Sequence, residues 1–104
     1  MKFIFLAFLV LNAASVEAKV VKKSVEYRHN ETILEGFLAY DDSIKQKLPG
    51  VVVMHEWTGI NDYIKEKVEQ LAKLGYLAFA PDIYGKGIRP SPGKEAAELA
   101  GRFK

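Results

Sequence analysis

VVVMHEWTGINDYIKEKVEQLAKLGYLAFAPDIY, residues 51–84, is the stretch of sequence that decides the fold. Val51–Met54 is apolar at every position, which predicts a strand covered on both faces. His55–Asn61 reads as a polar turn, and an amphipathic helical pattern follows it. Tyr76–Ala80 is a second apolar run of strand length. Together these segments predict one βαβ unit with two parallel strands.

The helix of this unit has start and stop signals in addition to its periodicity. Asn61 or Asp62 can cap its first turn, and Gly75 stands where a left-handed residue ends a helix. The positions predicted to face the core recur at spacings of four, three and three, and they are Ile64, Val68, Leu71 and Leu74.

A β-hairpin is predicted before this unit. Ser24–Arg28 alternates between apolar and polar residues, and Thr32–Tyr40 is a second strand. His29-Asn30-Glu31 is the polar turn between them. Gly36, inside the second strand, predicts a bulge or a bend.

A further helix is predicted after the βαβ unit. Ser91 can cap it, with Pro92 at its first position. Its apolar stripe comprises Ala96, Leu99, Ala100 and Phe103. No stop signal follows, and only two buried parallel strands are available to receive this stripe, so the architecture reads as interrupted.

Composition excludes several classes of protein. The chain has 104 residues, of which 49% are hydrophobic and 27% charged, a globular balance. A net charge of +2 is too small to predict a nucleic-acid partner. The sequence has no cysteine, which excludes a disulfide framework, a thiolate zinc site and a cysteine nucleophile within these residues.

The first 18 residues have the pattern of a signal peptide. One lysine precedes Phe3–Leu11, an apolar run too short to span a bilayer, and small residues follow. Cleavage is predicted after Ala18, with Ser15 as the alternative; a buried N-terminal strand or helix is the competing interpretation. The remaining domain, 19–104, would be secreted or periplasmic, without stable membrane association.

Several chemical motifs are absent. His55-Glu56 begins like the zinc motif HExxH, but Gly59 replaces the second histidine and the pair ends a strand. Residues 85–87, GKG, lack the spacing of a phosphate-binding loop, and no dinucleotide fingerprint or G-x-S-x-G elbow occurs. We therefore expect no metal and no cofactor.

The polar turn itself remains as a candidate site. Backbone amides ahead of a helix N-terminus suit a developing oxyanion, and the amide of Trp57 is the candidate donor. The Glu56 carboxylate can orient or deprotonate a nucleophile. The structural alternatives are a cap or an ion pair at the helix start for Glu56, and plain core packing for Trp57.

Residues from about Val25 to Tyr84 resemble the N-terminal half of the dienelactone hydrolase family, a branch of the α/β hydrolases. The resemblance rests on LEGFLAYDD at 34–42 and on HEWTGIND, LAKLGY and APDIYG, which follow in order within 51–87. It implies an incomplete α/β-hydrolase fold, with an N-terminal hairpin, a βαβ unit and the start of a further helix. It also implies that a Cys-His-Asp triad cleaves a small ester or lactone through an acyl-enzyme.

The resemblance also implies roles for individual residues. Glu56 would contact and activate the nucleophilic cysteine, and the Trp57 amide would line the oxyanion hole. Tyr84 and Lys86, in and just after the APD-x-Y motif, would contact the substrate, with Lys86 on its carboxylate. Lysine stands there where arginine is usual, and lysine lacks the bidentate fork of arginine, which leaves the charge of the substrate open.

The family's triad lies beyond the region that these residues cover, and neither His29 nor His55 can replace its histidine. Three interpretations follow. The chain is part of a hydrolase and inactive alone, or a short protein that binds a carboxylate without chemistry, or an interaction module that uses an exposed sheet edge.

Overall fold

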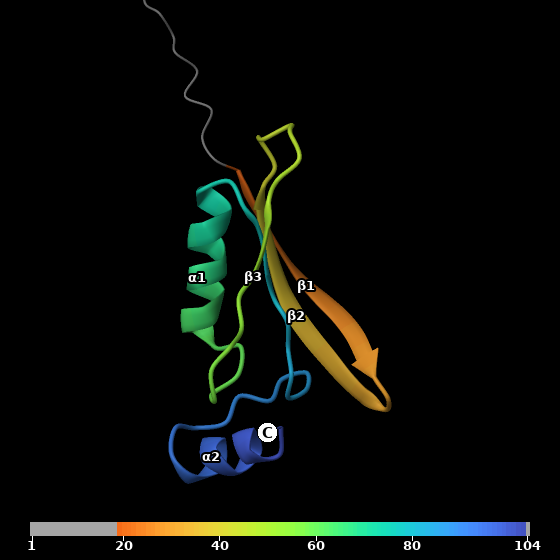
Figure 1. Cartoon of the computed structure of the whole chain (residues 1–104), viewed down its shortest axis with the longest axis vertical. Helices are drawn as coiled ribbons and strands as arrows, with labels where there is room; N and C mark the ends of the chain where they lie inside the picture. Colours follow the sequence, from red (N-terminus) through yellow and green to blue (C-terminus); the bar gives the residue numbers. More distant parts are fainter. Residues whose placement is uncertain (1–18, 104) are drawn as a thin grey trace, which may run out of the picture.

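The computed structural model describes residues 19–103, and the predicted signal peptide at 1–18 lies outside them (Figure 1). None of the described helices has the length and hydropathy needed to cross a membrane. The elements in chain order are β1 (Val20–His29), β2 (Thr32–Asp41), β3 (Gly50–Val52), α1 (Asp62–Lys73), β4 (Leu77–Ala80) and α2 (Lys94–Gly101).

The four strands form one mixed sheet in the order β1-β2-β4-β3. β2 pairs antiparallel with both β1 and β4, whereas β3 pairs parallel with β4, with Val51 opposite Ala78. The predicted βαβ unit is therefore confirmed, and its two strands are direct neighbours. α1 packs along one face of this sheet (Figure 1).

The hairpin is longer than predicted, and Gly36 is needed for a different reason than the one predicted. β1 and β2 pair without interruption from Val20 opposite Asp41 to the ends of the strands, so the bulge, one of the two alternatives predicted at Gly36, is wrong; the bend stays a prediction. A Cβ on Gly36 would lie 2.6 Å from the ring of Phe79 on β4. The glycine is required because that ring crosses directly over the β2 backbone.

Helix α1 has the predicted start and end but a shifted buried face. Asn61 is the N-cap, since its Oδ1 accepts a hydrogen bond from the Ile64 amide at 3.1 Å. Leu74, predicted to be buried, is 75% exposed, because the helix ends at Lys73 and Leu74 is its C-cap. The buried residues instead follow a spacing of four and are Ile64, Val68 and Ala72.

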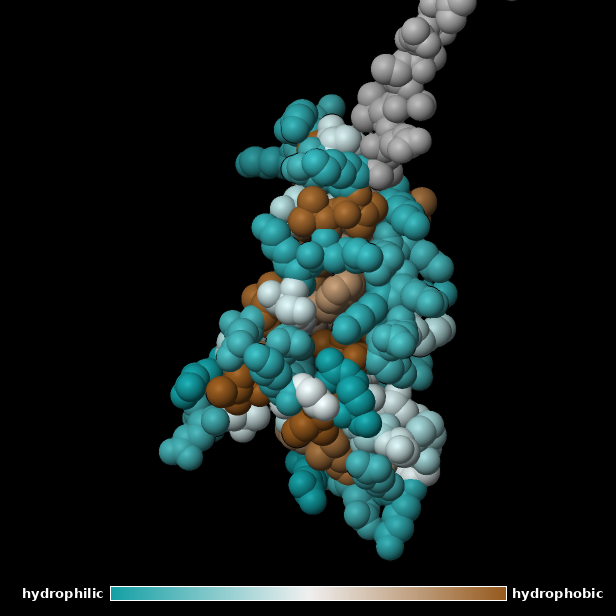
Figure 2. Space-filling view, turned by 180° about the vertical axis from the view of Figure 1, so that it is seen from behind, coloured by the Kyte–Doolittle hydropathy of each residue, from teal (hydrophilic) through white to brown (hydrophobic). Residues whose placement is uncertain are grey.

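The prediction that Val51–Met54 is a strand covered on both faces is wrong for the described chain. β3 ends at Val52, and Val52 and Met54 are 65% and 55% exposed. The physical reason is position: β3 is an edge strand, and helix α1 covers only one face of the sheet. Figure 2 shows hydrophobic side chains in separate patches on the molecule seen from behind.

The last helix starts later than predicted. Gly93, with a φ of 112°, is the N-cap of α2, and no side chain caps the helix, so the prediction of Ser91 as cap and Pro92 as first residue is wrong. The contact runs in the opposite direction: the Ser91 amide donates to the Glu95 carboxylate at 3.3 Å. Within the apolar stripe of α2, Ala96 is fully buried.

Three loops meet at one end of the sheet (Figure 1). They are the β1–β2 turn at Asn30-Glu31, the β3–α1 loop from Val53 to Asn61, and the start of the β4–α2 loop at Pro81. The predicted site residues lie in the second and third of these loops.

Candidate active site

The β3–α1 loop is a tight turn that depends on one glycine. The Gly59 amide donates to the Glu56 carbonyl at 3.1 Å, and the Asn61 amide donates to the Gly59 carbonyl at 2.9 Å. Gly59 has a φ of 77°, and a Cβ there would lie 2.9 Å from the carbonyl oxygen of Ile88. Any other residue at Gly59 would disturb the loop that carries Glu56.

His55 links this loop to the end of β4. Its Nε2 accepts a hydrogen bond from the Ile83 amide at 3.2 Å, so Nε2 carries no proton. Its Nδ1 lies 2.7 Å from the Glu56 carbonyl oxygen, which can only accept. These two partners assign His55 to the neutral tautomer with the proton on Nδ1. The ring also packs against Tyr84, with 4.9 Å between ring centroids.

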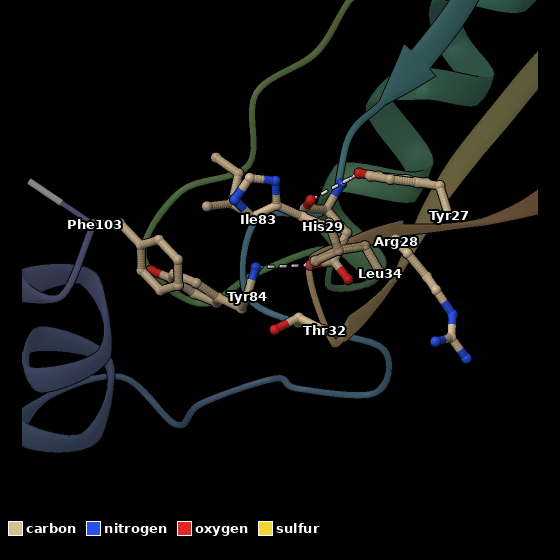
Figure 3. Close-up of a pocket in the computed structure, with 9 residues that line it drawn as sticks. Tyr27, Arg28, His29, Thr32, Leu34, Ile83, Tyr84 and Phe103 are labelled. Carbon is tan, nitrogen blue, oxygen red and sulfur yellow. Dashed lines mark hydrogen bonds between the residues drawn. The ribbon is translucent and has the colours of Figure 1, made fainter.

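Asp82 shapes the opposite loop. Its buried carboxylate accepts hydrogen bonds from the backbone amides of Glu35, Tyr84 and Gly85 at 3.0 to 3.2 Å. The Tyr27 hydroxyl donates to the Asp82 carbonyl and accepts from the Asp82 amide, both at 2.7 Å. The bonds to Tyr27 and Tyr84 are dashed in Figure 3. The carboxylate thus ties the loop that carries Tyr84 to β2.

Tyr84 connects the two loops. Its hydroxyl donates a hydrogen bond to the Trp57 carbonyl at 3.0 Å, and its side chain is buried. The structure therefore brings Glu56, Trp57 and Tyr84 together, as one group. The Tyr84 ring faces the site, whereas its hydroxyl is occupied by the protein; its predicted contact with substrate stays a prediction.

The Glu56 carboxylate and the Trp57 amide have no hydrogen-bond partner among the described residues. The Glu56 carboxylate is exposed and forms no hydrogen bond or ion pair with any described residue, and Asn61 caps the helix in its place. Trp57 is 44% exposed, which disagrees with simple core packing. Among residues 19–103, no acceptor binds the Trp57 amide.

Two adjoining cavities share Ile83, Tyr84 and Phe103. The smaller, of about 230 Å³, is also lined by His55, Glu56, Trp57 and Ala100. The larger, of about 480 Å³, lies toward the hairpin turn and is also lined by Tyr27, Arg28, His29, Thr32, Leu34 and Asp82 (Figure 3). The unpaired carboxylate of Glu56 lines the smaller cavity.

Lys86 is placed apart from the other predicted site residues. Its ammonium lies 3.2 Å from a Glu26 carboxylate oxygen and 3.6 Å from one of Glu35, and it lines neither cavity. The hydrogen bond to Glu26, assisted by both carboxylates, raises the pKa of Lys86. Two negative charges surround this lysine in the absence of substrate.

Three residues that position the site, His55, Asp82 and Tyr27, were absent from the predicted set. The sequence predicts His55 neither as a metal ligand nor as the triad histidine; in the described part of the chain, no group of three His, Asp or Glu side chains could hold a metal ion. For Asp82 a local signal existed, because an aspartate in a turn commonly binds the amides that follow it. The partner of Tyr27 lies far away in the sequence and had no local signal.

A family model described as "Dienelactone hydrolase family" matches residues 34–104. A protein of Escherichia coli named "Putative hydrolase fragment YghX" is 43% identical over 49 residues, which cover 47% of this chain and 42% of that protein. Protein usf of Aquifex pyrophilus is 40% identical over 63 residues, which cover 58% of this chain and 26% of that protein. The chain thus spans well under half of the length of these relatives.

Solved structures that resemble this chain are also dienelactone hydrolase-like. The crystal structure of P91, described as a dienelactone hydrolase-like promiscuous phosphotriesterase from metagenomic libraries, has a TM-score of 0.72 and 30% identity. The match covers 81% of this chain and 35% of P91. A structure named m3DLH has a TM-score of 0.68 and 34% identity, covering 80% and 33% of the two chains. The sheet and helices described above correspond to part of that fold.

Proposed function

The chain belongs to the dienelactone hydrolase family, and from that premise we propose that it forms the oxyanion-hole side of an enzyme that cleaves small carboxylic esters or lactones. Family membership indicates a hydrolase. The choice of a carboxylic ester and the roles of individual residues are our proposal.

The observation that carries this proposal is the pairing of a free amide with a free carboxylate. The Trp57 N–H and the Glu56 side chain are adjacent in a tight loop, beside a cavity, just before the N-terminus of α1. The partial positive charge of a helix N-terminus favours negative charge nearby. A single oxyanion donor is worth about 2.7–4 kcal/mol of transition-state stabilisation.

The nucleophile must come from outside these 104 residues if it is a cysteine, because the sequence has none. In the proposed reaction the Glu56 carboxylate takes the proton of the thiol, the thiolate attacks the carbonyl carbon, and the carbonyl oxygen becomes an oxyanion at the Trp57 amide. Collapse of this intermediate breaks the carbon–oxygen ester bond, and the leaving alkoxide takes the proton back from Glu56. Water then hydrolyses the thioester, which releases the acid and restores the thiol. The chain alone would bind such a substrate without turning it over.

The surroundings of Lys86 bear on the charge of the substrate. One ammonium faces two carboxylates, those of Glu26 and Glu35, so this corner has a formal charge of −1. That charge favours a neutral ester or lactone over an anionic one. The contact between Lys86 and a substrate carboxylate stays a prediction.

We also propose export. The signal peptide predicted at 1–18 would place the enzyme in the periplasm or outside the cell. N-terminal sequencing of the protein recovered outside the cytoplasm should begin at Lys19; a product that retains Met1 would contradict export by this route.

Reading the gene beyond codon 104 and assaying its full product tests the catalytic proposal. We expect a G-x-C-x-G element in frame and hydrolysis of p-nitrophenyl acetate or a small lactone. A stop codon directly after codon 104, with an inert product, would contradict it.

The second candidate is a binding protein without chemistry, supported by the unpaired Trp57 amide beside the smaller cavity. The chain from residue 19 would then melt cooperatively, at a temperature that rises with a small carboxylate or lactone. A molten chain that binds a hydrophobic dye would count against it.

A further inference from the structure

We propose that His55 is a positioning residue that aims the Trp57 amide at the reacting carbonyl oxygen. The inference rests on the proposed function for its consequence in catalysis. Its structural content, a hydrogen-bonded imidazole that fixes one peptide plane, stands independently of that function.

The peptide bond between Glu56 and Trp57 links the directions of two polar groups. The carbonyl of Glu56 and the amide N–H of Trp57 belong to the same planar trans peptide, so they point in opposite directions. The Nδ1–H of His55 donates to that carbonyl at 2.7 Å. A donor that holds the carbonyl on one side therefore holds the Trp57 N–H on the other, where no described residue accepts from it.

The ring of His55 is itself held by the neighbouring strand end. The Ile83 amide, just after β4, donates to Nε2 at 3.2 Å. This bond keeps the proton on Nδ1, the nitrogen that faces Glu56. His55 therefore transmits the position of the β4 end to the peptide plane that carries the predicted oxyanion donor.

A second tether fixes the next peptide. The Tyr84 hydroxyl donates to the Trp57 carbonyl at 3.0 Å, and the Tyr84 ring packs on the His55 ring. Both peptide groups that flank the Trp57 Cα are thus held by side chains that contact each other. The direction of the Trp57 amide is set before any substrate arrives, which is the condition for effective oxyanion stabilisation.

The same bonds limit what else His55 can do. Both of its ring nitrogens are engaged by backbone groups, so neither is free to take a proton from a nucleophile or from water. Its expected influence is therefore on the transition state, through the amide, and not on proton transfer.

Two substitutions separate the two halves of the imidazole. In His55→Asn the amide nitrogen can occupy the place of Nδ1 and donate to the Glu56 carbonyl. In His55→Gln the side-chain oxygen can occupy the place of Nε2 and accept from Ile83, but the donor beside Glu56 is lost. In the full gene product we expect kcat to fall about tenfold to a hundredfold in His55→Gln and by less than about threefold in His55→Asn, with KM nearly unchanged in both.

The control pair is His29→Asn and His29→Gln. His29 is exposed and lines only the larger cavity, not the one beside Glu56 and Trp57, so these two variants should not differ from each other. Equal losses of kcat in the two His55 variants would show a merely structural role and overturn the proposal.

A direct structural measurement does not depend on activity. Nitrogen NMR of the labelled protein should show the Nδ1–H tautomer of His55 and a coupling across the hydrogen bond from Ile83 to Nε2. The Nε2–H tautomer, or an absent coupling, would overturn the proposal even if esters are hydrolysed. The expected tautomer in a full product that hydrolyses no ester would instead reject the proposed function and leave the positioning intact.

Discussion

The hydroxyl of Tyr27 both donates to the carbonyl and accepts from the amide of Asp82, and each hydrogen bond is 2.7 Å long. This pair joins β1 to the loop after β4, although β2 lies between those strands in the sheet. The Asp82 carboxylate in turn holds the amide of Tyr84. The hairpin therefore supports one wall of the candidate site from the far side of the sheet.

We expect Tyr27→Phe to destabilise the protein by about 1–3 kcal/mol, because it leaves two backbone groups of Asp82 without their partner. Urea unfolding measures this change. The matched control is Tyr40→Phe, since no described residue forms a hydrogen bond with the Tyr40 hydroxyl, and its effect should lie within about 0.5 kcal/mol. Equal effects of the two substitutions would contradict the importance of the Tyr27 bonds.

The same tyrosine predicts a loss of stability at alkaline pH. Burial raises the pKa of Tyr27 above 10.0, and the nearby Asp82 charge adds to the rise, while the backbone hydrogen bond opposes it. The unfolded state then loses its proton first. The contribution of Tyr27 is complete below the unfolded pKa and is lost as pH rises through the folded pKa. The difference in unfolding free energy between wild type and Tyr27→Phe should therefore shrink above about pH 10; a constant difference would contradict it.

Gly36→Ala should destabilise the sheet by about 1–3 kcal/mol, the usual range for overpacking. The added methyl would lie 2.6 Å from the Phe79 ring and 2.9 Å from the Ala80 carbonyl oxygen. Replacing the ring in Phe79→Leu should recover part of the loss, so the double variant should be more stable than additivity predicts. Gly50→Ala, which meets nothing within 4 Å, is the control. Strict additivity would show that the ring is not the obstacle.

These residues show how far sequence patterns predict this fold. Short-range signals worked where the cause is local: Asn61 caps α1, and Gly75 ends it with a φ of 100°. Gly36 was misread because its reason, the Phe79 ring, lies on another strand. The exposure of Val52 was also missed, because an apolar run does not reveal which faces other elements cover.

In the candidate site, too, some features were predictable from the sequence and others depend on contacts between distant segments. The polar turn before the helix and the resemblance to a family both point to Glu56 and Trp57, and the structure places them beside one cavity. The direction of the Trp57 amide was not predictable, because it depends on contacts with His55 and Tyr84 that exist only after β3 and β4 pair. The two glutamates beside Lys86 were not predictable either, because Glu26 and Glu35 lie far from it in the sequence.

The glutamates around Lys86 predict a change in substrate preference. In the full gene product, Glu26→Gln with Glu35→Gln should lower KM for an ester with a free carboxylate by about two- to fivefold, the modest effect expected of solvent-exposed charges. KM for a neutral ester should not change. Adding Lys86→Met should cancel the gain, whereas Lys47→Met, in an exposed loop, should not. An unchanged KM for the anionic ester would show that Lys86 does not contact the substrate.

Glu56→Gln should slow acylation by about a hundredfold in the full gene product, near the lower end of what a positioned acid or base contributes. The substitution keeps the shape of the side chain and removes its charge, so a nearby thiol would lose the base that takes its proton. Because the Glu56 carboxylate is exposed and bonds to no described residue, stability should change by less than about 0.5 kcal/mol. The measurement is the burst rate with p-nitrophenyl acetate, with Glu66→Gln on the exposed side of α1 as control. An unchanged burst rate would reduce Glu56 to a surface residue of the loop.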